Sequence, residues 1–375
     1  MRLLVDAHLD LSWNALSFDR DQTLELADIN AREQGMTGKC RTRATVSLPE
    51  MRKARAGICL ATILCRAMPP GTPEMTFNLG PAGDRKRGEI ILREELDFAS
   101  QMIASATGQG QLAYYKLLEE QGWLRMIRTQ ADLEEVRAAW DAEEPDTPIG
   151  YILSMEGCDP MITPKHAEWW FEQGLRTACI AHYGWSAYAM GTGGDGPLTP
   201  AGRELVKEFD RLGLILDLVH TADTALDQAL EIYQGPVFCS HGNSRTLVDC
   251  DRQLTDDQIR RIIERDGVIG AVCDAWMIVP GWQRDAEPKP ACSLENLADH
   301  IDHICQLAGN ARHVGIGSDL DGGFGWEQTP KEIQSIAHLH KLDELLAGRG
   351  WSDADREGFF NGNWLRFFGE HLPKG

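Results

Sequence analysis

The feature that most constrains this chain is a series of eight short apolar runs separated by longer amphipathic segments. Each run is continuous rather than alternating, as expected for strands that are covered on both faces within a parallel sheet. Helical patterns fill the gaps, for example at Thr199-Pro200, where a capping residue precedes an N1 proline, and at Thr255, which has capping-box spacing. The predicted strands are Leu3–His8, Gly57–Cys65, Ile149–Glu156, Thr177–His182, Leu214–His220, Pro236–His241, Gly267–Asp274 and His313–Asp319.

Eight successive strand-then-helix units predict an α/β fold, a closed (β/α)8 barrel of the TIM type. We expect residues 1–375 to form one such domain, with an insertion at about residues 66–148 that holds at least two helices. The apolar spacing of Leu92–Phe98 predicts a helix. An open doubly wound sheet is the alternative, but it would normally carry a Gly-rich phosphate loop after its first strand, and this sequence has none there.

Composition restricts the partners of the chain. The sequence has 37 Lys and Arg against 57 Asp and Glu, a formal net charge of −20, which argues against a nucleic acid or an anionic membrane as a partner. No apolar stretch reaches the ~18 residues of a membrane-spanning helix, and Asp6 interrupts the first apolar run, so we expect no secretory leader. The ten cysteines are scattered without a CxxC pair, and we expect them to be reduced, in a cytoplasmic protein.

Acidic and imidazole side chains recur at the carboxyl ends of the predicted strands. His8 and Asp10 are two residues apart in extended chain and can reach one metal ion. A single His-x-Asp motif is, however, also typical of a polar strand end that faces solvent. His, Glu or Asp recurs at the carboxyl ends of other strands, and these ends meet on one face of a barrel. Histidines that merely pack in the core would not all lie at that end of their strands. The other strand-end residues are Glu156, His182, His220, His241 and Asp319.

This set favours a two-metal site. Three imidazoles and three carboxylates from this set are already more ligands than one tetrahedral zinc needs. Two metal ions bridged by a carboxylate and a water would lower the pKa of that water and polarise a carbonyl group, and a nearby carboxylate would act as the general base. His313 lies at the opposite end of its strand and is expected to be structural or solvated.

Six motifs are distributed over nearly the whole chain. They are Asp6-Ala7-His8-Leu9-Asp10, Ser47-Leu48-Pro49-Glu50-Met51, Met155-Glu156-Gly157, Leu198-Thr199-Pro200-Ala201-Gly202, Ser240-His241-Gly242-Asn243-Ser244-Arg245 and Gly317-Ser318-Asp319-Leu320-Asp321-Gly322. In this order and spacing, they resemble the membrane (renal) dipeptidase family, the M19 zinc metallopeptidases. The resemblance implies a barrel of the metal-dependent hydrolase kind and a dipeptidase that contains two zinc ions.

The resemblance also implies roles for individual residues. His8 and Asp10 would bind one zinc ion, His220 and His241 the other, and Glu156 would bridge both. It further implies that Asp319 is the acid/base carboxylate, that His182 contacts the tetrahedral intermediate, that Arg252 pairs with the terminal carboxylate of the substrate, and that Trp13 lies near the pocket mouth. An ordinary loop arginine and a core-packing tryptophan are the alternatives for the last two. A homodimer is also implied.

The chain departs from the family pattern in three places. Val219 precedes His220 where the family often has serine, and Val272–Met277 replaces a Tyr-containing segment of the mammalian members, so substrate preference cannot be transferred. The last residues, Phe367–Gly375, lack the hydrophobic tail of a lipid-anchored member.

Three functions stay open on the sequence. The first is a zinc dipeptidase, in a family that often accepts a D-residue at the C-terminal position of the dipeptide. The second is a broader amidohydrolase that acts on a cyclic amide, lactam or ester. The third is a non-catalytic binding protein, which would be expected to lose metal ligands, whereas none of the five is missing. The ligand set would accept divalent ions other than zinc.

Overall fold

The computed structural model describes residues 1–375 except 39, 70–71, 73–75, 79–83, 87–95, 145 and 287–289. Within this part of the chain, eight parallel strands pair in the order in which they occur, and the last strand, β13, pairs with the first, β1. A bridge between Cys239 and Ile269 joins the two remaining neighbours, so the sheet closes into a ring. The strands are β1 (Leu4–Leu9), β2 (Ala56–Leu64), β8 (Ile149–Glu156), β9 (Leu175–Cys179), β10 (Ile215–Asp217), β11 (Val237–Phe238), β12 (Ile269–Ala271) and β13 (Val314–Ile316).

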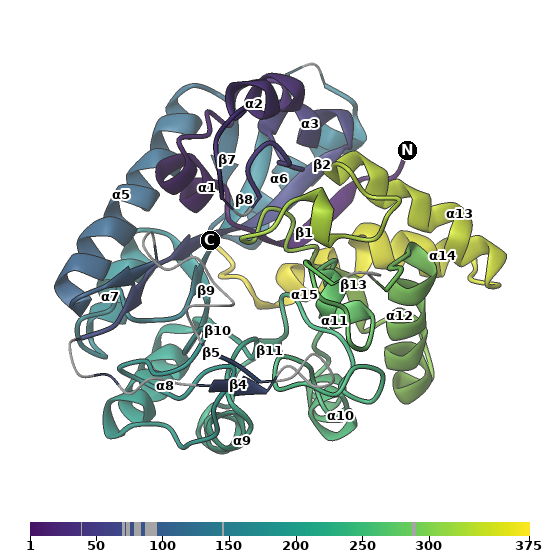
Figure 1. Cartoon of the computed structure of the whole chain (residues 1–375). Helices are drawn as coiled ribbons and strands as arrows, with labels where there is room; N and C mark the ends of the chain where they lie inside the picture. Colours follow the sequence, from purple (N-terminus) through teal and green to yellow (C-terminus); the bar gives the residue numbers. More distant parts are fainter. Residues whose placement is uncertain are drawn as a thin grey trace.

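Helices surround this ring, and the predicted (β/α)8 barrel is confirmed (Figure 1). These continuous apolar strands are buried along their whole length, because side chains inside the barrel cover one face of the sheet and the surrounding helices cover the other. The helices are α1 (Leu11–Phe18), α2 (Leu26–Arg32), α3 (Leu48–Lys53), α5 (Gln101–Glu120), α6 (Gln130–Asp141), α7 (His166–Glu172), α8 (Pro200–Leu212), α9 (Asp223–Ile232), α10 (Asp256–Glu264), α11 (Ala275–Ile278), α12 (Leu294–Ala308), α13 (Lys341–Gly348), α14 (Asp353–Glu357) and α15 (Asn363–His371), with short turns η2 (Trp326–Gln328), η3 (Ile336–His340) and η4 (Gly358–Gly362).

The helix caps predicted at Thr199 and Thr255 are confirmed. Thr199 caps α8 by accepting a hydrogen bond from the Gly202 amide, and the helix ends at Gly213, whose φ of 72° is left-handed. Thr255 and Gln258 form the predicted capping box of α10. These short-range contacts follow from residue type and spacing alone, so the sequence predicts them well.

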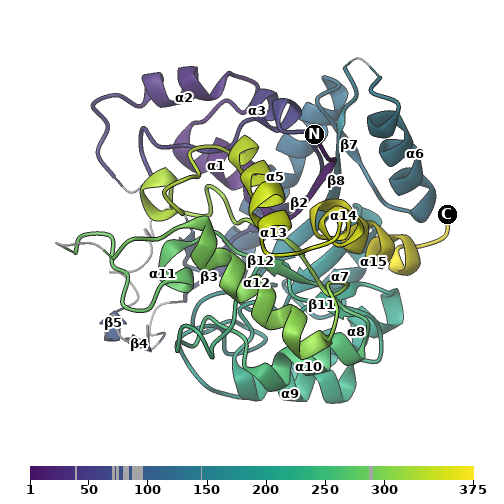
Figure 2. The same cartoon turned by 90° about the vertical axis from the view of Figure 1, so that its right-hand side faces the viewer.

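The segment between β2 and β8 contains α5 and α6 and several short strands. The helix predicted over Leu92–Phe98 is wrong at its end, because Asp97–Phe98 forms strand β6, which pairs with β3 (Arg66–Ala67), while residues 92–95 lie outside the described part. Figure 2 places β3 and the pair β4–β5 on the same side of the barrel as α11. The remaining strands are β4 (Thr76–Asn78), β5 (Asp84–Lys86) and β7 (Leu124–Met126), the last of which pairs with β8.

Helix α15 packs an aromatic face against the barrel. Trp364 donates a hydrogen bond from its indole nitrogen to the carbonyl oxygen of Ile316 in β13, and its ring meets Phe238 of β11 at 5.8 Å between centroids. Gly315 leaves room for that ring, since an added Cβ would lie 2.3 Å from the Trp364 nitrogen. None of the described helices is both long and apolar enough to cross a bilayer. All ten cysteines lie in the described part, and no disulfide joins them.

Trp364→Ala is therefore expected to destabilise the barrel by about 3–5 kcal/mol, the usual cost of removing a large buried aromatic side chain. The change in the free energy of unfolding is measured by denaturant unfolding, monitored by circular dichroism rather than by tryptophan fluorescence. Trp326→Ala is the matched control, because Trp326 is 38% exposed and its loss should change stability by less than about 0.5 kcal/mol. Equal effects of the two substitutions would contradict a packing role for Trp364.

Candidate active site

The candidate ligands lie at the carboxyl ends of the barrel strands because of a common register. His8 lies in β1, Asp10 follows it directly, and Glu156 is the last residue of β8. Four further strands are each followed, three residues beyond the last residue of the strand, by a polar side chain, so these side chains project over the same end of the barrel. They are His182 after β9, His220 after β10, His241 after β11 and Asp319 after β13.

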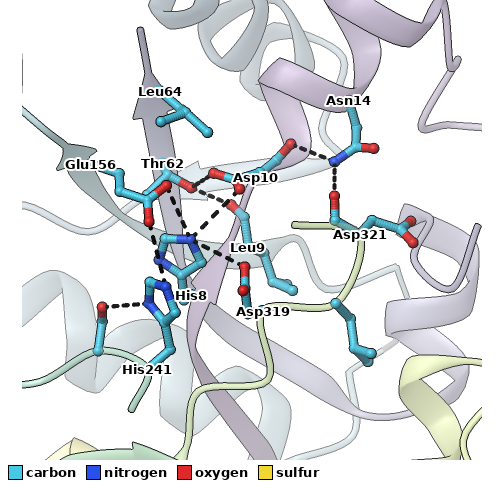
Figure 3. Close-up of polar contacts among 12 residues, drawn as sticks. His8, Leu9, Asp10, Asn14, Thr62, Leu64, Glu156, His241, Asp319 and Asp321 are labelled. Carbon is cyan, nitrogen blue, oxygen red and sulfur yellow. Dashed lines mark hydrogen bonds and ion pairs between the residues drawn. The ribbon is translucent and has the colours of Figure 1, made fainter. Parts of the chain in front are cut away.

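Glu156 lies at the centre of this group. Its Oε1 is 3.0 Å from His220 Nε2 and 3.4 Å from His241 Nε2, and its Oε2 is 3.7 Å from His8 Nε2. His8 Nε2 is in turn 3.6 Å from Asp10 Oδ2 and 3.7 Å from Asp319 Oδ1. Figure 3 shows the side chains of His8, Asp10, Glu156, His241 and Asp319 pointing toward one another. The carboxylate of Glu156 thus lies where two metal ions could share it.

Three overlapping groups of side chains could each hold a metal ion, with ligand atoms within 4.8 Å of one another. His8 belongs to two groups and so do His241 and Glu156, as expected of a site with more than one ion. The Nε2 atoms of His8 and His241 are buried and have no hydrogen-bond partner among the described residues. A buried, unpartnered nitrogen costs free energy, and coordination of a cation would remove that cost. The groups are His8–His241–Asp319, Glu156–His220–His241 and His8–Asp10–Glu156.

Hydroxyl groups orient the candidate ligands from the side away from the site. Thr192 Oγ1 lies 2.9 Å from His220 Nδ1, and Ser240 Oγ lies 2.9 Å from His241 Nδ1. A hydroxyl oxygen can accept the Nδ1 hydrogen, which leaves the Nε2 lone pair directed at the site. Thr62 donates to Asp10 Oδ1 at 2.6 Å and holds that carboxylate in the same way (Figure 3).

The pKa values of the site histidines are shifted in opposite directions. Burial lowers the pKa of His220 and His241 well below the ordinary value, and the positive charges of Arg252 and His8 lower it further. These two rings are therefore neutral, as ligands must be. Burial also lowers the pKa of His8, but Glu156 and the other carboxylates more than offset this and raise it to about 10. A metal ion would thus displace a proton from His8 on binding.

The carboxyl groups of the site have too little positive charge around them to offset their burial. Burial raises the pKa of Glu156 to about 8, although His8 opposes the shift. Burial likewise raises the pKa of Asp319 well above its ordinary value, with His8 opposing and Glu156 adding to the shift. Neighbouring buried carboxylates resist joint ionisation unless a cation neutralises them, so this donor set fits divalent metal ions.

The backbone turns sharply where two of these side chains enter the site. His220 and Asp319 have φ angles of 58° and 56°, in the left-handed region that non-glycine residues seldom adopt. The predicted strand ends at His220 and Asp319 are three residues too late, because β10 ends at Asp217 and β13 ends at Ile316. Gly322 makes room for the second turn, because an added Cβ would lie 1.8 Å from Asp319 Oδ1.

Two buried carboxylates connect neighbouring strand ends. Asp6 in β1 accepts hydrogen bonds from the Ser318 amide at 2.9 Å and hydroxyl at 2.5 Å, and Ser318 directly precedes Asp319. Asp217 in β10 accepts from the Ser240 amide at 3.0 Å, and Ser240 directly precedes His241. In both pairs, a carboxylate on one strand positions the residue before a site side chain on the next strand.

The other predicted residues are distributed as follows. His182 lies in the site, with Nε2 3.6 Å from Glu156 Oε1. Arg252 is buried and donates to the carbonyl oxygen of His241 at 3.2 Å; burial lowers its pKa, but Tyr183 and Asp319 more than offset this and raise it. Trp13 is buried in a small apolar cluster and meets Phe18 edge to face at 5.0 Å. Its placement at a pocket mouth stays a prediction.

Sequence reasoning missed three residues that orient the site: Thr62, Thr192 and Ser240. Two of them carried a usable signal, because Thr62 is a hydroxyl residue inside the apolar run of β2 and Ser240 directly precedes His241. Thr192 had none, since it reaches the site through a bridge between Tyr183 and Thr192 that only the folded chain creates.

Divalent metal is expected to stabilise the folded chain, because binding to the native state alone contributes roughly 2.7 kcal/mol at a hundredfold excess over Kd. Thermal unfolding of chelator-treated protein with and without Zn²⁺ measures this as an upward shift in Tm. Glu156→Gln should lose most of the shift. His303→Gln is the control, since His303 pairs with Asp256 on the outside of the barrel, and it should keep the full shift. A shift that survives Glu156→Gln would place the metal elsewhere.

Comparison with known proteins gives similar sequences over part of the chain. An uncharacterised dipeptidase of Schizosaccharomyces pombe is 30% identical over 224 residues, 58% of this chain and 52% of that protein. The dipeptidase AclJ of Aspergillus oryzae is 32% identical over 209 residues, 54% of this chain and 47% of that protein. The match with mouse dipeptidase 3 is 31% over 175 residues, 46% and 32% respectively. The matched regions thus span about half or less of these relatives.

Solved structures share the fold over almost the whole chain. The dipeptidase AC, a metallopeptidase of family M19, superposes with a TM-score of 0.74 at 21% identity and covers 99% of both chains. A metallopeptidase of Rhodobacter sphaeroides, liganded with a phosphinate mimic of the dipeptide L-Ala-D-Ala, has a TM-score of 0.74 at 20% identity, with 98% and 99% covered. The model of the membrane dipeptidase family matches residues 2–372. The chain therefore belongs to the membrane dipeptidase family, peptidase family M19.

Proposed function

We propose that this protein is a metal-dependent dipeptidase that hydrolyses the peptide bond of a dipeptide at a site containing two zinc ions. The observation that carries the proposal is the set of three overlapping ligand groups around Glu156, in a chain of family M19. The dipeptide mimic bound to the Rhodobacter sphaeroides enzyme supports a substrate of this size, and it extends the proposal to a D-residue at the C-terminal position.

His8 and Asp10 would hold one ion, His220 and His241 the other, and Glu156 would bridge them. The central position of the Glu156 carboxylate, between His8 on one side and the other two imidazoles on the other, supports this division. When bound, the metal ions would polarise the scissile carbonyl and make water acidic enough to attack it at neutral pH. Imidazole nitrogen and carboxylate oxygen also suit other divalent ions.

Asp319 would move the proton. Its Oδ1 lies 3.7 Å from His8 Nε2, at the edge of the ligand groups, and its side chain is 13% exposed, so it can face both water and substrate. In the proposed reaction Asp319 accepts a proton from the attacking water as the new C–O bond forms. It then returns that proton to the peptide nitrogen as the C–N bond breaks, and one water molecule is consumed for two amino acids released.

Two cationic or polar side chains would position the substrate. Arg252 would pair with the free C-terminal carboxylate, since guanidinium binds a carboxylate through two parallel hydrogen bonds. Its contact with the His241 carbonyl ties it to a residue of the ligand groups. His182 would donate a hydrogen bond to the carbonyl oxygen as negative charge develops there.

Asp319→Asn should lower kcat by ~10²-fold or more, the scale expected for loss of a general acid/base, while the metal content stays near two equivalents per chain. Steady-state kinetics and elemental analysis of protein purified without chelators measure both quantities. Glu156→Gln provides the contrast, because it should lose metal as well as activity. Loss of both ions in Asp319→Asn would make Asp319 a ligand rather than the base. A wild-type content of one ion would contradict the bridged pair.

Arg252→Met should reduce kcat/KM for dipeptides by roughly 10- to 100-fold, which corresponds to a charge-assisted hydrogen bond of about 1.5–3 kcal/mol. Dipeptide amides, which lack the carboxylate, should be poor substrates of the wild type and nearly indifferent to the substitution. Arg261→Met is the control, since Arg261 pairs with Asp227 on the outer helices. If the wild type cleaved a dipeptide and its amide equally well, the broader amidohydrolase would be the better description.

A further inference from the structure

Arg66 makes a buried contact with the ring of His182. Arg66 lies in β3, immediately after the second barrel strand, and its Nη1 is 3.0 Å from His182 Nδ1. Both side chains are buried, and Arg66 is among the largest fully buried side chains of the chain. Its Nε is 2.9 Å from Asp97 Oδ1 in β6, so an ion pair across the β3–β6 pairing holds the guanidinium in place.

The chemistry of this contact determines where His182 carries its hydrogen. A guanidinium group has only donors, so His182 Nδ1 must accept the hydrogen bond. The ring hydrogen is then on Nε2, which is the atom that faces Glu156 Oε1 at 3.6 Å. His182 therefore presents a donor to the site and cannot coordinate a metal ion through that nitrogen.

The neighbouring histidines have the opposite kind of partner. The Nδ1 atoms of His220 and His241 each meet a hydroxyl oxygen, from Thr192 and Ser240, which can accept a hydrogen and leave the Nε2 lone pair free to bind metal. The rings of His182 and His220 lie only 4.4 Å apart between centroids. Two adjacent histidines at the same register after their strands thus differ in role because of the group behind each ring.

We propose that Arg66 is a positioning residue that fixes His182 as an Nε2–H donor directed at the carbonyl oxygen of the scissile bond. The part that this donor plays in catalysis rests on the proposed function. The tautomer of His182 rests only on its contact with Arg66. An oxygen that gains negative charge during attack is stabilised by a donor already aligned with it. Arg66 supplies that alignment through His182 and does not itself touch the reacting atoms.

The tautomer is tested directly by ¹⁵N NMR of protein labelled at histidine. The His182 signals, assigned by their loss in His182→Asn, are expected to show a protonated Nε2 and an unprotonated Nδ1 in the zinc-loaded protein. Arg66→Met removes the donor and should give a mixture of tautomers, whereas Arg66→Lys keeps a group that can only donate and should retain Nε2–H. A protonated Nδ1 in the wild type, or an unchanged tautomer in Arg66→Met, would overturn the proposal.

Kinetics then separates positioning from a general structural effect. Arg66→Met should lower kcat for a dipeptide by about 10- to 100-fold, with KM and metal content nearly unchanged. The double variant Arg66→Met/His182→Asn should be no slower than His182→Asn alone, because Arg66 acts through that ring. Additive losses would show that Arg66 acts by another route and would refute the proposal.

Arg176→Met is the matched control. Arg176 is also a buried arginine, but it lies at the start of β9 and donates to the carbonyl oxygens of Arg128 and Phe171, away from the ligand groups. Its loss should leave the His182 tautomer and kcat unchanged. If the wild type hydrolyses no dipeptide while His182 is an Nε2–H donor that depends on Arg66, the proposed function fails and the contact stands. If the wild type hydrolyses dipeptides but the His182 tautomer does not depend on Arg66, only the role proposed for Arg66 is refuted.

Discussion

Glu156 is a buried carboxylate whose oxygens lie within 3.7 Å of the Nε2 atoms of four histidines, and the arrangement of this end of the barrel depends on that contact set. A carboxylate is expensive to bury, and its neighbours at Asp10 and Asp319 add further negative charge. Imidazoles alone balance this charge only by taking up protons, as the raised pKa of His8 shows. A pair of divalent cations would neutralise the same carboxylates without protonating the rings.

The sequence predicted the parts of this structure that depend on position along a strand. Eight continuous apolar runs, each followed by a helical pattern, predict a parallel sheet covered on both faces, and the absence of a Gly-rich loop after the first strand favours the closed barrel over an open sheet. The strand-end position of His8, Glu156 and Asp319 then follows from topology, since parallel strands in a ring present their carboxyl ends on one face. The helix caps at Thr199 and Thr255 were equally local and equally predictable.

What escaped prediction depends on contacts between distant segments. Arg66 and His182 are 116 positions apart, and no local pattern indicates that they meet. Asp97–Phe98 has helical spacing but forms a strand, because pairing with β3 outweighs a weak local preference. Most of the barrel strands also end before their apolar runs do, and the left-handed φ angles of His220 and Asp319 leave no trace in the apolar pattern.

The buried carboxylates Asp6 and Asp217 have a consequence for how such a site could be transferred between barrels. Each receives hydrogen bonds from the serine that precedes a site residue on the neighbouring strand, so Asp319 and His241 depend on a partner strand for their position. The transferable unit is therefore a pair of adjacent strands rather than a single side chain. Grafting His241 alone onto another eight-stranded barrel would bring the imidazole without the carboxylate of Asp217, which holds the preceding serine. The ring would then be present but misplaced.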